Sequence, residues 1–103
     1  MARRDRVTKT RPPIGMPAGI VLLATPDGYR HSVLTEEGAM VCGRLVDVPA
    51  HADASEARAA AAALVAALAH DFHHTDVEVT WDPPRQPGSW TARVSVTAAS
   101  PDA

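Results

Sequence analysis

The sequence has little of several residue types, and each shortage removes a class of protein. Cys42 is the only cysteine, so no disulfide can form within the chain and nothing points to an oxidising compartment. No apolar run approaches the roughly 20 residues that a membrane-spanning helix needs, and the charged N-terminus lacks the apolar segment of a signal peptide. We therefore expect a cytoplasmic protein with no membrane partner.

Aromatic residues make up only 4% of the chain although hydrophobic residues make up 46%, because alanine supplies much of the apolar content. Alanine buries little area, so we expect a small core that depends on a few large residues. Such a domain is marginally stable alone, which favours a homodimer. Lys9 is the only lysine among ten basic residues, and this preference for arginine and alanine is typical of a GC-rich, bacterial coding sequence.

The chain also lacks recognisable catalytic motifs. No nucleophile elbow, phosphate-binding glycine loop or cysteine metal motif is present. The position of Cys42 beside an apolar strand is more typical of a small buried hydrophobe than of a nucleophile paired with His31. We expect no enzymatic activity, no catalytic residue and no cofactor.

Positive charge is concentrated at the N-terminus. Residues 1–11 contain five basic residues against Asp5, and a segment rich in proline and glycine follows. This composition predicts a flexible basic arm over residues 1–18, one α+β domain over residues 19–99 and a flexible tail over residues 100–103. The basic side chains are candidates for contacts with nucleic acid phosphates. They are Arg3, Arg4, Arg6, Lys9 and Arg11.

Apolar patterning and turn residues predict five strands and one helix in the order β-β-β-α-β-β. The strands are expected at residues 20–24, 29–35, 39–48, 77–82 and 90–96. The first is a continuous apolar run, which predicts burial on both faces, and Gly43 in the third suggests a bulge. We expect one helix packed on one face of a mainly antiparallel sheet.

The helix is predicted to begin at a capping box formed by Asp53 and Glu56. A spacing of 3.6 residues per turn places six apolar side chains on the face that contacts the sheet. They are Ala57, Ala61, Leu64, Val65, Leu68 and Phe72. The opposite face carries small alanines and ends in His70, His73 and His74.

Two surfaces are candidates for contact with a protein partner. The outer helix face is smooth, and Ala59, Ala63 and Ala66 would let a second helix approach closely. Trp81 and Trp90 flank a stiff, proline-rich loop that contains Arg85, and we expect the two indoles to pair across the strands. At the end of the helix, His70 and His74 have the spacing of a weak metal-binding pair, although an exposed, capping cluster at the negative helix end is the favoured explanation.

The order of elements from Tyr29 through Phe72, strands followed by a helix, resembles that of antitoxins of the HicB type. The resemblance implies a small protein that neutralises a toxin and regulates its own operon. From the residues themselves we expect a non-enzymatic interaction or regulatory module that binds a protein partner and forms a homodimer. The alternative is a nucleic-acid-associated regulator that uses the basic arm.

Overall fold

The computed structural model describes residues 14–46 and 48–97. One helix and five strands form in the predicted order. Their bounds are β1 (Pro17–Thr25), β2 (Gly28–Thr35), β3 (Met40–Arg44), α1 (Ala54–His73), β4 (Val77–Trp81) and β5 (Ser89–Val96). The α+β class and the single helix on an antiparallel sheet are confirmed.

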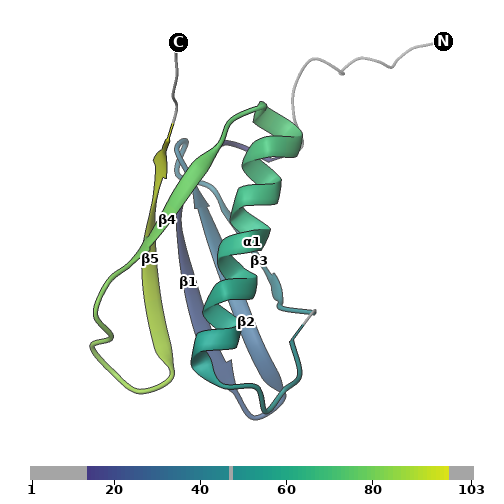
Figure 1. Cartoon of the computed structure of the whole chain (residues 1–103), viewed down its shortest axis with the longest axis vertical. Coiled ribbons are helices and arrows are strands. Elements are labelled where there is room, and N and C mark those ends of the chain that lie inside the picture. Colours follow the sequence, from purple (N-terminus) through teal and green to yellow (C-terminus); the bar gives the residue numbers. More distant parts are fainter. Residues whose placement is uncertain (1–13, 47, 98–103) are drawn as a thin grey trace, which may run out of the picture.

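All five strands belong to one sheet with the spatial order β3-β2-β1-β5-β4. In this order β1 lies at the centre, and β3 and β4 form the two edges. Every neighbouring pair of strands is antiparallel. The helix lies across one face and packs against β1, β2 and β4 (Figure 1). Within the described residues, no element covers the opposite face, which we call the open face.

The central strand shows how one layer of helix divides the sheet. Ile20 and Leu22 are fully buried beneath α1, whereas Val21 is half-buried and Leu23 is 42% exposed on the open face. The prediction that this run is buried on both faces is therefore wrong. Successive side chains of a strand point to opposite faces, and only one of the two faces receives a helix.

The helix begins as its capping residues predict. The carboxylate of Asp53 accepts a hydrogen bond of 2.8 Å from the backbone amide of Glu56. The helix ends at His74, which adopts the left-handed conformation (φ 53°), and its amide bonds back to the carbonyls of Ala69 and His70.

The buried stripe of α1 recurs every four residues. Ala57, Ala61, Val65 and Ala69 are fully buried, and the small alanines let the helix lie close to the sheet. The same spacing leads next to His73, whose Nε2 lies 2.9 Å from the carbonyl oxygen of Ile14. Phe72 is 38% exposed, so its predicted place in the core and the outward placement of His73 are both wrong.

The folded body begins earlier than the composition suggests. Ile14 is buried, the carbonyl of Met16 accepts a hydrogen bond of 2.9 Å from Glu36, and β1 starts at the buried Pro17. Residues 14–18 therefore belong to the body rather than to the predicted arm. Residues 1–13 and the predicted tail over residues 100–103 lie outside the described residues.

Candidate interaction surfaces

The open face of the sheet carries a run of apolar side chains, which we call its apolar centre, from Leu23 and Val21 on β1 through Leu34 on β2 to Met40 on the β3 edge. Val21 and Leu34 are half-buried there, and Leu23 and Met40 are 42% and 59% exposed. The backbone register places Leu23 between Arg30 on β2 and Ser89 on β5. Sequence analysis missed this surface because it assigned β1 entirely to the interior. The single helix predicted for five strands was the available signal that one face remains uncovered.

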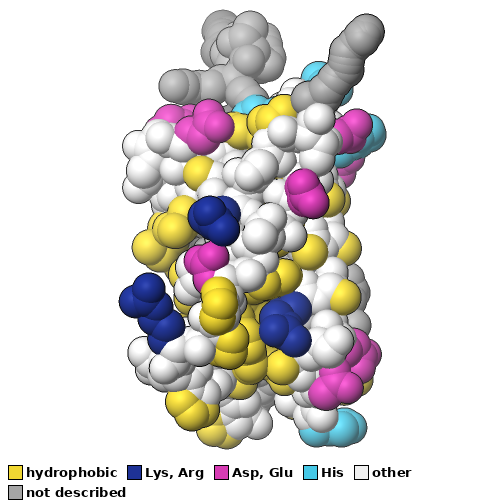
Figure 2. All heavy atoms as spheres, turned by 60° about the vertical axis from the view of Figure 1, so that its left-hand side comes forward, with side chains coloured by type: hydrophobic (Ala, Val, Ile, Leu, Met, Phe, Trp, Pro, Cys, Tyr) yellow, Lys and Arg dark blue, Asp and Glu magenta, His cyan; other side chains and the backbone are white. Residues whose placement is uncertain are grey.

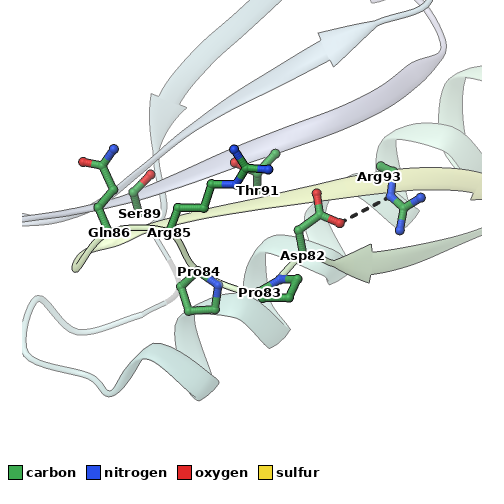
Figure 3. Close-up of a pocket in the computed structure, with 8 residues that line it drawn as sticks. All are labelled: Asp82, Pro83, Pro84, Arg85, Gln86, Ser89, Thr91 and Arg93. Atoms are coloured by element: carbon green, nitrogen blue, oxygen red, sulfur yellow. Dashed lines mark ion pairs between the residues drawn. The ribbon is translucent and has the colours of Figure 1, made fainter.

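A polar groove of about 770 Å³ adjoins the open face where the loop between β4 and β5 folds over (Figure 3). Its walls carry two guanidinium groups and several neutral hydrogen-bonding side chains. They are Arg85, Arg93, Gln86, Ser89 and Thr91, together with Asp82, Pro83 and Pro84. Arg85 extends along β5 toward Thr91 in Figure 3, so its guanidinium lies beside the polar side chains of the strand.

The ion pairing within this groove is uneven. Nε of Arg93 lies 3.4 Å from Oδ1 of Asp82, and both side chains are well exposed. Within the described part of the chain, neither Arg85 nor Arg30 forms an ion pair with a carboxylate. Arg85 is therefore the guanidinium of the groove that has most capacity to accept an anionic group from a partner.

The two tryptophans lie on the helix side of the sheet, but they do not pair with each other as predicted. Trp81 faces Ala92 across the strands, and Trp90 faces Leu22. The Trp90 ring instead lies 6.4 Å from Tyr29, and the guanidinium of Arg58 lies 5.9 Å from its centroid. Figure 2, which brings the β4–β5 edge forward, shows hydrophobic side chains gathered there among scattered basic groups.

Trp90 and Arg85 meet at a smaller hollow. A cavity of about 300 Å³ on the proline-rich loop is lined by both side chains and by Pro84, Pro87 and Gly88. The carbonyl of Gly88 accepts a hydrogen bond of 2.8 Å from Ala24, which ties the loop to the central strand. Of the predicted protein-contact residues, the structure thus brings Arg85 and Trp90 together. Trp81 lies opposite Ala92 on β4 and does not line this cavity.

A third hollow of about 400 Å³ lies between α1 and the β3 edge, and apolar side chains dominate its lining. Ala63 is exposed in its wall, whereas Ala59 is exposed elsewhere on the helix and Ala66 is half-buried. At 3.6 residues per turn, Ala59, Ala63 and Ala66 nevertheless lie within about 60° of one another on one side of the helix. Their use as a contact surface stays a prediction.

His31 lines this third hollow, and the sequence analysis assigned no binding role to it. Its Nδ1 atom is buried and forms no hydrogen bond within the described residues, and burial lowers the pKa of the imidazole. A Cβ at Gly43 would lie 3.2 Å from the imidazole Cε1 and Nε2 atoms. The pairing of β2 with β3 is regular at this point, so the predicted bulge at Gly43 is wrong, and the glycine instead makes room for the ring.

The remaining chemical candidates are separated in space. Cys42 is exposed on the open face, with Sγ 3.3 Å from Oγ of Ser32, and was wrongly expected to be buried. It lies on the face opposite His31. Nδ1 of His70 lies 3.3 Å from Oδ1 of Asp71, and His74 is the exposed C-cap of α1. Among the described residues, no three potential ligands come together to hold a metal ion.

Two further expectations concern the ends of the chain and its surroundings. The basic side chains from Arg3 through Arg11 lie outside the described residues. No helix in the described part of the chain is long and apolar enough to cross a membrane.

No family model matches the sequence, and neither the curated proteins nor the solved structures contain a match.

Proposed function

We propose that this protein is a non-enzymatic interaction module that binds a protein partner through the open face of its sheet. The apolar centre of that face carries the proposal. Leu23 and Met40 stand 42% and 59% exposed beside the half-buried Val21 and Leu34. Exposed apolar groups clustered on a sheet, rather than scattered singly, are characteristic of a surface that another molecule covers.

The geometry of the sheet supports this proposal. Five strands at about 4.8 Å spacing span roughly 19 Å between the outer axes, whereas a helix is about 10–12 Å wide with its side chains. The single helix α1 therefore covers only part of one face and none of the other. Covering the open face would require a second layer, which the described residues do not supply.

The absence of enzymatic activity is part of the proposal. Its support is the separation of reactive groups: the thiol of Cys42 and the imidazole of His31 lie on opposite faces of the sheet. A nucleophile and its base need to be within hydrogen-bond reach, and this pair is held apart by the strands themselves.

The test compares two substitutions of similar exposure on different surfaces. Leu23→Asp places a charge on the open face, and Phe72→Asp places one on the helix, where the side chain is 38% exposed. Wild-type and variant chains would be co-expressed with the products of neighbouring genes, and binding measured on the purified pairs. We expect Leu23→Asp to reduce affinity at least tenfold and Phe72→Asp to leave it nearly unchanged. A partner that tolerates Leu23→Asp but not Phe72→Asp would refute the assignment of the surface.

We further propose that the chain forms a homodimer through the β3 edge. β3 is short and open, and Val41 and Met40 are exposed along it. Native edges of this kind are usually paired, covered or charged. Sedimentation equilibrium should return twice the chain mass, and Val41→Lys should return the mass of a monomer. A loss of the dimer in Ala63→Arg alone would place the interface on the helix, and a monomer throughout would exclude the dimer.

A nucleic-acid-associated regulator is the second candidate, and one observation favours it. Of the five arginines in the described residues, only Arg58 lies on the helix, and the others border the open face. Together with the basic N-terminal segment, they offer contacts to phosphates. Binding to DNA or RNA with a steep loss of affinity as salt increases would support this function. Binding that does not depend on salt would count against it.

A further inference from the structure

The open face has the opposite charge balance from the rest of the molecule. Strand alternation places Arg30, Arg44 and Arg93 on it, and the bordering loop adds Arg85. Three carboxylates share this face: those of Glu78 and Asp82, and that of Asp76, which continues the β4 register opposite Thr97. The other carboxylates of the described residues lie at turns and helix ends, outside the face. They are Asp27, Glu36, Glu37, Asp53, Glu56 and Asp71.

The positive groups surround the apolar centre rather than replace it. In the register of the sheet, Arg30 is the neighbour of Leu23 on β2, and Arg93 is the neighbour of Gly19 on the opposite side of β1. Arg85 extends the rim over the polar groove (Figure 3). An apolar centre with arginine at its rim is the usual composition of a protein–protein contact surface.

From this arrangement we propose that the open face binds an acidic protein segment that also carries apolar side chains. The inference rests on the proposed interaction function and names the chemistry of the partner. Carboxylates of the segment pair with Arg30 and Arg85, which have no carboxylate partner within the described residues. Apolar side chains of the same segment cover Leu23 and Met40.

Two other occupants fit the face less well. A second copy would bring one positive face against another, and like charges at an interface oppose association. Single-stranded nucleic acid gains much of its affinity by stacking bases on aromatic rings, but Tyr29, Trp81 and Trp90 all lie on the helix side of the sheet. Phosphates also gain nothing from Leu23 or Met40. The combination of arginine and exposed apolar groups therefore selects a protein segment.

The experiment uses the full chain labelled with ¹⁵N and four probes of equal length. The probes are an alternating Glu/Leu peptide, a Glu/Ser peptide, a Lys/Leu peptide and a single-stranded oligothymidylate. Amide chemical shifts report both the affinity and the surface. We expect the Glu/Leu peptide to bind most tightly and to shift the amides of Leu23, Arg30, Arg85 and Thr91. The Glu/Ser peptide should be weaker, because it cannot cover the apolar centre.

A matched pair of charge reversals separates local from general electrostatics. Arg85→Glu should weaken binding of the Glu/Leu peptide about 5–10-fold, since it replaces an attraction at the rim by a repulsion. Arg58→Glu changes the net charge equally but lies on α1, and it should leave the affinity nearly unchanged. Circular dichroism of both variants checks that the fold is retained.

Each contrary result has a distinct meaning. Equal losses in the two variants would show a general charge effect and overturn the inference. If oligothymidylate binds more tightly than the Glu/Leu peptide, the face binds nucleic acid. If the Lys/Leu peptide binds more tightly than the Glu/Leu peptide, the face binds a protein segment, but the inferred acidic character of that segment is wrong. If no probe at millimolar concentration shifts the amides of the open face, the proposed docking function itself fails together with the inference.

Discussion

A single methyl group added at Gly43 should reveal how tightly the imidazole of His31 fits against β3. The Cβ of an alanine there would lie 3.2 Å from both Cε1 and Nε2 of the ring. That separation is well inside the usual distance between non-bonded carbon atoms of about 3.5–4.0 Å. The ring cannot retreat freely, because its Nδ1 side is already buried. Gly43→Ala should therefore overpack this site.

Two opposing effects set the size of the change. Replacing glycine by alanine in a strand stabilises by about 0.5–1 kcal/mol, because the unfolded chain loses conformational freedom. Forcing extra carbon into a packed site costs about 1–3 kcal/mol. In the wild-type background we expect Gly43→Ala to lower the free energy of unfolding by about 1 kcal/mol. With His31→Ala also present, the methyl group meets no ring, and Gly43→Ala should raise that free energy by about 0.5–1 kcal/mol.

Urea unfolding of the four chains completes a double-mutant cycle. The expected coupling between the two sites is about 1–3 kcal/mol, with Gly43→Ala changing sign between the two backgrounds. Changes that add to within about 0.5 kcal/mol would show that the methyl group and the ring do not contact each other. In that event the conformation of His31 described here, and the reason for glycine at this position, would both be incorrect.

Three further measurements test the core and its boundary. Burial lowers the pKa of His31 below the 6.5 of the free side chain, so the unfolded chain binds this proton at a higher pH than the folded chain does. The contribution of His31 to the free energy of unfolding is therefore complete above about pH 6.5 and is lost as pH falls toward the folded pKa. In urea unfolding, His31→Phe should reduce this dependence of stability on pH. Val65→Ala should cost about 2–3 kcal/mol, because it empties a fully buried site, whereas Phe72→Ala should cost less than about 1 kcal/mol in the same assay; equal losses would mean that the helix is rotated. Deleting residues 14–17 from a chain that already lacks residues 1–13 should lower the Tm markedly. An unchanged Tm would mean that residues 14–17 belong to the predicted flexible arm and not to the folded body.

Local signals in the sequence were sufficient to locate the elements. Asp53 and Glu56 identify the start of α1 because capping is decided within one turn. Alternation in the two C-terminal strands predicts their apolar and wet faces for the same reason, since each side chain's direction follows from the backbone alone. The one-helix α+β arrangement then follows from the small number of ways to cover an apolar sheet.

Non-local relations accounted for the errors. The stripe on α1 turned out to recur every four residues, because the alanines allow close packing along one line and displace Phe72 from it. The reason for Gly43 depends on a ring contributed by the neighbouring strand, and strand register is not encoded in the glycine's own surroundings. The segment at Ile14 is fixed by a hydrogen bond from His73, across 59 positions of sequence.

The net charge of the chain is a poor guide to the partner that we propose, for a geometric reason. The whole sequence sums to −2, which argues against binding any anion when the charge is treated as uniform. Strand alternation, however, sends neighbouring residues to opposite faces, so Arg30 and Arg93 reach the open face while His31 and Ala92 beside them face the helix. Carboxylates remain at turns and helix ends, where capping and solvation favour them. Because exposed charges are screened beyond about 10 Å at ordinary salt, a docked segment interacts with the face it touches and hardly with the acidic remainder. For the recognition that we propose, the relevant charge is therefore that of the open face, where four guanidinium groups meet three carboxylates.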